Sequence, residues 1–430
     1  MSWKRRHALR MFLRSSLWPI PLACMIAAVG VAHLTLWIDH LTGWTLNVSA
    51  DSARTVGGTL TGSLLTFIVF IFSVLLVAVQ LASAQFSPRV IARVFKDKYT
   101  KAALAVFVFT YTYSLVCLSR LQEPVQLLSG VLCAYGTLTC LAVFLLLIDR
   151  LGKELRPVRI LTGVAAEGRK VIRSIYPRTL AEVNRADAPA QSASLGKPSR
   201  VVIYNGDPGV VLAFDDQGLL QVARQADCVV ELLPEVGDFV APDDPLFRIY
   251  EGGRPIDEER LCQLVACGPE RTLEQDPMFA FRIIVDIASK ALSPAINDPT
   301  TAVLAIDQIH HLLREVGNRL LDDGRNFDAA GKLRVVYRTP DWEDFVLLAA
   351  TEIRQFGRES IQVMRRLRAM LENLIETLPE TRTALLKLEL SLLHRSAERF
   401  FTEPEDRALA EVGDSQGVGG TSGSSWGGSP

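Results

Sequence analysis

The stretch that decides the fold is residues 59–81, TLTGSLLTFIVFIFSVLLVAVQL, which contains no Asp, Glu, Lys or Arg. A helix rises about 1.5 Å per residue, so roughly 20 apolar residues cross the hydrocarbon core of a bilayer. Three further stretches of similar length are also free of these charged residues. The sequence therefore predicts four transmembrane helices, at about residues 17–38, 59–81, 102–119 and 125–148.

The charges outside these stretches predict how the chain crosses the membrane. Lys and Arg gather before the first stretch, between the second and third, and after the fourth, whereas the other two loops hold only Arg54 and Arg120. Because cytoplasmic loops carry the excess of Lys and Arg, both termini are expected in the cytoplasm of a bacterium, with the protein in the inner membrane. Residues 1–150 hold 13 Lys/Arg against 5 Asp/Glu, and the remainder holds 33 against 42. A basic membrane part thus precedes an acidic soluble part.

The second predicted helix carries a stripe of small and polar residues along one side. Polar residues recur every seven positions, at Thr59, Thr66, Ser73 and Gln80, and the small residues Gly62 and Ser63 adjoin the same face. Such a stripe serves close packing between membrane helices, here against the small residues between 126 and 140 of the fourth helix. It serves equally to line a wet pathway once several subunits close around it. Both interpretations stay open at this point.

The loop after this helix is basic and amphipathic. Apolar residues alternate at helical spacing with Arg89, Arg93 and Lys96, which predicts a helix lying at the inner leaflet. Membrane lipid is the expected partner, and these three side chains are candidates for contact with lipid headgroups. A patch this short does not indicate a nucleic-acid interface.

Composition divides the chain into five parts. The predicted fold class is an α-helical membrane protein with an α+β cytoplasmic domain, which contains a small β-barrel-like module and a C-terminal helical domain. The expected parts are a four-helix transmembrane domain (1–150), a basic helix and linker (151–199), the β module (200–252), the helical domain (253–412) and a disordered Gly/Ser-rich tail (413–430). Within the helical domain, residues 341–371 and 380–401 are expected as two long amphipathic helices.

Two Asp-Pro pairs begin a pair of helices in the helical domain. Asp suits the N-cap and Pro the first helical position, as at Asp276-Pro277 and Asp298-Pro299. The polar residues on and near the loop between these helices are candidates for binding a small ligand or a partner; they are Arg271, Asp276, Asp286, Ser293, Asn297, Asp298 and Thr300. The alternative is structural, with helix caps and an i,i+4 ion pair from Asp286 to Lys290.

The sequence offers no catalytic motif. It contains no phosphate-binding loop, dinucleotide fingerprint, zinc-protease motif or nucleophile elbow, and no cysteine or histidine spacing that indicates a metal site. The turn at Val236-Gly237-Asp238 is similar to that of biotinyl and lipoyl carriers, but residues 198–289 contain no lysine to hold such a cofactor. No catalytic residue, metal or cofactor is therefore predicted.

Three motifs carry a family resemblance. They are QLASAQFSPR at 80–89, the Arg271-Thr272 to Asp276-Pro277 segment, and ALSPAINDPTTA at 291–302. The chain resembles the bacterial predicted membrane proteins grouped as domain of unknown function 2254, from about Trp18 to Gly420. The resemblance implies an N-terminal helical bundle in the inner membrane and a cytoplasmic domain, and it brings no catalytic residues or established activity.

Two functional hypotheses follow. The first is a homo-oligomeric, channel-like or transport-related protein, in which the second helix lines the pathway and the cytoplasmic domain assembles and gates it. Association belongs to this hypothesis, since four short spans do not enclose a pore alone. The second is a membrane-anchored sensor or interaction protein, in which the helices only pack and the loop at 293–301 binds a partner or a small ligand.

Overall fold

The structure, a computed structural model, describes residues 18–85, 98–154, 156–182, 195–250 and 255–420, together with Trp3, Arg6 and Ser16. The chain forms two compact units, one within residues 10–159 and one from Ile160 onward. The two units are described in turn.

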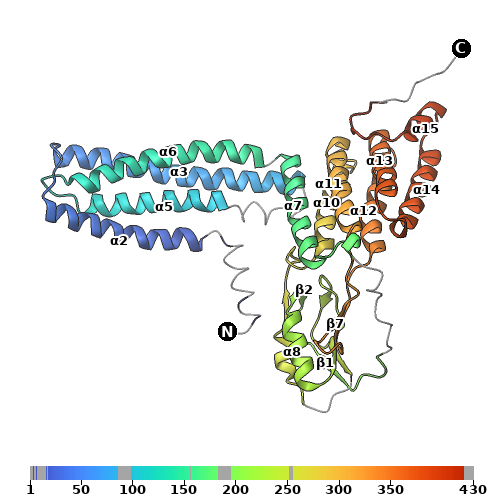
Figure 1. Ribbon diagram of the computed structural model, residues 1–430. Coiled ribbons are helices and arrows are strands. Elements are labelled where there is room, and N and C mark those ends of the chain that lie inside the picture. Colours follow the sequence, from blue (N-terminus) through green and yellow to red (C-terminus); the bar gives the residue numbers. More distant parts are fainter. Residues whose placement is uncertain are drawn as a thin grey trace. The chain divides into compact units, whose positions relative to one another are not determined.

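The described residues of the first unit form four helices (Figure 1), which are α2 (Pro19–Thr42), α3 (Ala50–Gln85), α5 (Lys98–Ser119) and α6 (Leu127–Glu154). Each is long and apolar enough to cross a bilayer, which confirms the four predicted spans. Helices α2 and α6 begin two residues later than predicted and end later, α5 begins earlier, and α3 extends beyond both predicted boundaries. Its 36 residues would extend about 54 Å at about 1.5 Å per residue, more than the thickness of a hydrocarbon core.

Helix α5 packs against α2, α3 and α6, and its contacts with α2 and α3 are more extensive than those that α6 makes with them. Small residues allow the close approach. A Cβ at Gly136 of α6 would lie 2.9 Å from Cγ2 of Thr110 on α5. On the other side, the hydroxyls of Thr35 (α2) and Tyr113 (α5) are 3.0 Å apart, and both side chains are buried. The unit is therefore joined by small-residue contacts and by a buried hydroxyl pair, as is usual where no water can satisfy a polar group.

Two carboxylates cap helices other than their own at one end of the unit. Asp39 of α2, only 2% exposed, accepts hydrogen bonds from the backbone N–H groups of Leu128 and Ser129, both at 2.9 Å. Glu123 accepts from the N–H of Ala50, the first residue of α3, at 3.3 Å. Orphan N–H groups in the first turn need acceptors, and an anion there also suits the helix dipole. Asp39, which follows the predicted first span directly, thus serves as a structural cap.

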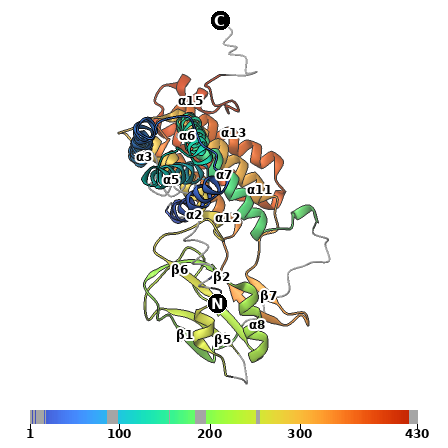
Figure 2. The ribbon, with the colours of Figure 1, turned by 90° about the vertical axis from the view of Figure 1, so that its left-hand side faces the viewer.

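The second unit combines two sheets with a group of helices (Figure 1 and Figure 2). Its strands are β1 (Arg200–Ile203), β2 (Gly209–Phe214), β3 (Val229–Leu232), β4 (Phe239–Val240), β5 (Pro245–Tyr250), β6 (Val265–Gly268), β7 (Arg325–Phe327) and β8 (Leu333–Tyr337). Its helices are α7 (Pro157–Ile175), η1 (Leu180–Glu182), α8 (Asp216–Ala226), α9 (Glu258–Cys262), α10 (Pro277–Ala291), α11 (Pro299–Gly317), α12 (Trp342–Phe356), α13 (Ile361–Thr377), η2 (Glu380–Arg382), α14 (Thr383–Phe400) and α15 (Pro404–Ala410). Helix α7 belongs to this unit from Ile160 onward.

The strands form two open sheets. The larger has the order β1-β5-β3-β8-β7 and the smaller β4-β2-β6. Only β3 and β8 pair in parallel, with Val230 opposite Val335, and the other pairs are antiparallel. No closed barrel occurs in the described part of the chain, so the expected barrel-like module is not what these strands form. The physical reason is that β8, which follows α11 in sequence, inserts between β3 and β7.

The helical part starts as the Asp-Pro pairs predict. Asp276 accepts from the N–H of Phe279 at 2.9 Å and caps α10, and Asp298 accepts from the N–H of Thr301 at 3.0 Å and caps α11. The single long helix expected over 341–371 is wrong, because the structure has α12 and α13 there. Helix α12 ends at Phe356 with Gly357 as its C-cap, and Ser360 caps α13 by accepting from the N–H of Val363.

A short C-terminal strap, residues 411–420, lies against α13. The guanidinium of Arg365, 1% exposed, donates to the carbonyls of Val412, Gly419 and Gly420 at 2.9, 3.0 and 2.7 Å. The carboxylate of Asp414 accepts three backbone N–H groups of the strap. The tail expected to be disordered from residue 413 is thus ordered as far as residue 420, and its last ten residues lie outside the described part.

Candidate functional site

The stripe on α3 lies on the outside of the membrane unit. Its six members, Thr59, Gly62, Ser63, Thr66, Ser73 and Gln80, are all exposed. The opposite side of α3 packs inward, and Leu64, Ile71 and Leu75 are at most 4% exposed. The four hydroxyls of the stripe each donate to the carbonyl four residues earlier, at 2.8 to 3.1 Å. The buried side of α3 is therefore apolar, and its exposed side carries the polar stripe together with large apolar residues such as Phe70, Leu76 and Val77.

The small residues of α6 do not face this stripe. Gly136 meets Thr110 of α5, and Gly130 meets Leu46, which precedes α3. Cys140 is buried, with its sulfur 3.9 Å from the carbonyl of Val106 on α5. The sequence suggested that the small residues of α6 pack against the stripe. Within one copy of the chain, Gly136 and Cys140 contact α5 instead, and Gly130 contacts the connection between α2 and α3.

The lipid-headgroup candidates Arg89, Arg93 and Lys96 lie outside the residues that the structure describes. The prediction of a basic helix at the inner leaflet stays a prediction.

The candidates for ligand or partner binding separate into three places. Arg271 pairs with Asp276 at the start of α10. Asp286, two and a half turns later, accepts from Arg282 at 2.6 Å. Ser293, Asn297 and Asp298 lie in the loop before α11, and Thr300 follows them in the first turn of that helix.

Within that loop the polar groups are largely engaged in the turn itself. The hydroxyl of Ser293 donates to the carbonyl of Lys290 at 2.6 Å, Asp298 accepts from Thr301, and Asn297 has a φ of 49°. Of the four candidate residues here, Asn297 and Thr300 are exposed. The observed contacts are those of helix caps and a tight turn.

Arg271 and Asp276 connect the sheets to the helices. Asp276 is 2% exposed, and burial raises the pKa of its carboxyl, against which the Arg271 guanidinium acts. The turn at Gly237, with a φ of +100°, lies against the same guanidinium, and a side chain at this position would overlap it. The turn that is similar to that of biotinyl and lipoyl carriers thus packs against the side chain of Arg271.

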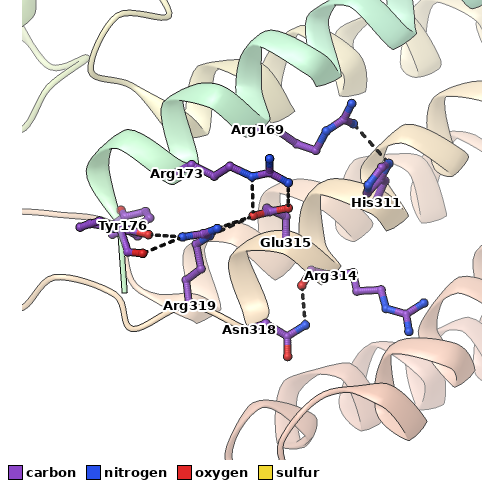
Figure 3. A network of polar contacts seen from close by, with 9 residues as sticks. Arg169, Arg173, Tyr176, His311, Arg314, Glu315, Asn318 and Arg319 are labelled. Carbon is purple, nitrogen blue, oxygen red and sulfur yellow. Dashed lines mark hydrogen bonds and ion pairs between the residues drawn. The ribbon is translucent and has the colours of Figure 1, made fainter. Parts of the chain in front are cut away.

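Glu315 anchors α7 to α11 (Figure 3). It accepts from Nε and Nη2 of Arg173 at 3.0 and 2.9 Å and from Arg319 at 2.9 and 2.8 Å. Arg319 also donates to the carbonyls of Tyr176 and Pro177. Hydrogen bonds from Arg173, and then from Arg319, lower the pKa of Glu315 to about 2. Since α7 begins three residues after α6 ends, this network fixes the element that follows the last membrane helix in the chain.

A cavity of about 490 Å³ opens where β8 ends. Its walls come from the segment after α11, the segment from β8 to α12, and the end of η2. The charged groups in it are Asp322, Asp323, Arg338, Asp341, Glu343 and Arg382. Sequence reasoning missed all of them, because no local pattern connects three segments that only the fold brings together. No cluster of His, Cys, Asp or Glu able to hold a metal ion occurs among the described residues.

Four apolar helices followed by a unit of sheets and helices define a helical membrane protein with four candidate spans. The chain belongs to the family described as predicted membrane protein (DUF2254), whose model matches residues 14–373. It is 26% identical to the uncharacterized proteins Rv1290c of Mycobacterium tuberculosis and Mb1321c of Mycobacterium bovis, over 94% of this chain and 80% of each relative. No solved structure matches the chain.

Proposed function

We propose that this protein is a homo-oligomer of the bacterial inner membrane, in which α3 helices of neighbouring copies bound a polar pathway through the membrane. Both termini lie in the cytoplasm, on the argument from Lys and Arg in the loops. The cytoplasmic unit assembles the copies and gates the pathway.

The observation that carries the proposal is the orientation of α3. Lipid tails are apolar, so a helix at the edge of a membrane unit should turn apolar residues to lipid and small or polar residues to its neighbours. In α3 the side that packs on α5 and α6 is apolar, and the stripe is exposed among large apolar residues such as Phe70 and Leu76. Small and polar residues that favour a helix neighbour therefore face outward within one copy of the chain. A second copy or a column of water removes this conflict.

The hydroxyls of the stripe are compatible both with a second copy and with a column of water. Each is already bonded to its own helix, so packing between copies requires no new hydrogen bond. A hydroxyl oxygen keeps a free lone pair after donating, and a water or an ion can use it. Gln80 differs, since its amide has no hydrogen-bond partner within the described residues and an unpaired amide in lipid is costly.

Cross-linking tests the association. In a cysteine-free background, Ser63→Cys, Thr66→Cys and Ser73→Cys each place a thiol on the stripe, whereas Leu65→Cys and Phe72→Cys place it on the exposed apolar flank of α3. In native membranes the stripe variants should cross-link to dimers more efficiently than the flank variants. Equal cross-linking at both sets, or a monomer mass by light scattering in nanodiscs, would contradict association through the stripe.

Ion flux tests the pathway separately. Proteoliposomes with the wild-type chain should release a trapped ion, and Thr66→Leu with Ser73→Leu should stop the release without changing the cross-linked state. An oligomer that conducts no ion would support the association of the copies and exclude the channel.

The second candidate is a membrane-anchored sensor. The observation that favours it is the cavity beside β8, which lies in the cytoplasmic unit. A sensor would keep its response after the double leucine substitution, because the stripe then only packs.

A further inference from the structure

We infer that the cavity beside β8 binds a small zwitterion that carries a carboxylate and an ammonium group, such as an amino acid. The inference does not depend on whether copies of the chain associate. It rests on the volume of the cavity and on charges of both signs in its walls that do not pair with one another.

Arg382 supplies the positive side. Its guanidinium lies over the ring of Trp342 at 5.5 Å, and the indole N–H of Trp342 donates to the backbone carbonyl of Arg382 at 2.9 Å. Trp342 is 2% exposed, so this contact fixes the arginine in one place. A guanidinium has five N–H donors, and the one hydrogen bond that the side chain makes within the described residues is a long one, 3.4 Å to the carbonyl of Arg319. Glu343 and Asp341 act on it electrostatically, and no salt bridge joins it to a carboxylate of the described residues.

A half-buried guanidinium with unused donors favours a carboxylate ligand. Arginine binds a carboxylate through two parallel hydrogen bonds, and the planar group loses little freedom when it is already held. Burial lowers the pKa of Arg382, with the acids at Glu343 and Asp341 acting against this effect. Burial thus makes the unpaired cation costly, and an anion in the cavity would offset that cost.

Four carboxylates supply the negative side: Asp322, Asp323, Asp341 and Glu343. Three of them accept hydrogen bonds from neutral groups only. Asp322 accepts from the hydroxyl of Tyr337 and the N–H of Gly324, Asp323 from the N–H of Arg325, and Asp341 from the N–H of Asp344. None of the four forms a salt bridge within the described part of the chain.

The balance of these charges selects the ligand. Two arginines against four carboxylates leave the cavity net negative, which disfavours a free phosphate or a dicarboxylate. Arg338, the second arginine, is 68% exposed and lies 3.7 and 3.9 Å from Asp238 and Glu235. A ligand with one charge of each sign satisfies Arg382 and the acidic wall together. A volume of about 490 Å³ falls within the usual range of small-molecule sites, about 300–1,000 Å³.

Isothermal titration of the full chain in nanodiscs with each standard L-amino acid tests the inference. At least one amino acid should bind, and both its carboxamide, which lacks the carboxylate, and its N-acetyl form, which lacks the ammonium group, should bind at least about tenfold more weakly. Arg382→Gln should weaken binding by a similar factor, and Glu343→Gln, an exposed position that does not threaten folding, should weaken it less.

Arg358→Gln is the matched control, because Arg358 also lies over an aromatic ring, 4.5 Å from the centroid of Phe400, and lies outside the cavity. Its affinity should equal that of the wild type. The inference is overturned if no amino acid binds, if inorganic phosphate or acetate binds as tightly as the best amino acid, or if Arg382→Gln and Glu343→Gln both keep the wild-type affinity. The flux and cross-linking experiments have separate readouts, so their failure leaves this result unaffected.

Discussion

Replacing Asp414 with alanine should release the C-terminal strap from α13. The carboxylate accepts the N–H groups of Gln416, Gly417 and Gly419 at 3.0, 2.9 and 2.6 Å. These bonds hold the strap in the turn that brings the carbonyls of residues 419 and 420 to the buried guanidinium of Arg365. The strap therefore depends on one acid, and the buried arginine depends on the strap.

The expected magnitude follows from these bonds. A hydrogen bond to a charged group contributes about 1.5–3 kcal/mol, and a buried charge left without its partners costs about 3–5 kcal/mol. The three bonds do not add fully, because an opened strap lets water reach both the N–H groups and the guanidinium. We expect Asp414→Ala to lower the free energy of opening by about 2 kcal/mol, which raises the open population about 30-fold.

Limited trypsin digestion of the full chain in nanodiscs measures this opening. Cleavage after Arg407 requires α15 and the strap to detach, and its rate follows the open population when reclosing is fast. The fragment that begins at Ala408 should appear about 30-fold faster in Asp414→Ala than in the wild type. Ser415→Ala, at an exposed neighbouring position, should match the wild type. Equal rates in the two variants would refute the role assigned to Asp414.

Three further predictions concern pH, close packing and capping. Because the folded pKa of Glu315 is about 2 and its ordinary value is 4.5, its contribution to stability is fully present above about pH 4.5 and is lost as the pH falls toward 2. In Glu315→Gln the urea midpoint of the second unit should therefore depend less on pH over that window than in the wild type, and an equal pH dependence would contradict this. Gly168→Ala places a Cβ 2.6 Å from that of Ala280 and should cost about 1–3 kcal/mol in thermal unfolding, whereas Gly152→Ala, with nothing within 4 Å, should not destabilise the protein. Asp39→Ala leaves two N–H groups of α6 without their acceptor and should lower thermal stability in detergent by about 1–2 kcal/mol; no loss would mean that water replaces the carboxylate.

Local signals predicted much of the architecture. Charge-free stretches located all four membrane helices, since the length of an apolar run is itself the physical requirement for crossing a bilayer. The Asp-Pro pairs located the starts of α10 and α11, because a cap and its helix are neighbours in sequence. The stripe on α3 was visible as a pattern, and its chemistry needed only the helical period.

Other features were predicted incorrectly or not at all. The strands after residue 200 were expected as a barrel-like module, and they form two open sheets that recruit β8 from beyond α11. The strap has the composition of a disordered tail, and its order comes from Arg365, 47 to 55 residues earlier in the chain. The cavity has walls from three segments. In each case the deciding contact joins residues that are far apart in sequence.

The sequence by itself determined that the chain has four apolar helices, which positions cap α10 and α11, and which residues of α3 form a stripe. These properties depend on residues within a few turns of one another, where the period of the helix sets the geometry. Only the tertiary structure decided that the stripe faces outward, that β8 pairs with β3, and that Arg382 lines the same cavity as four carboxylates. Those outcomes depend on which surfaces exclude water from one another, and that choice is made among all the elements of the fold at once.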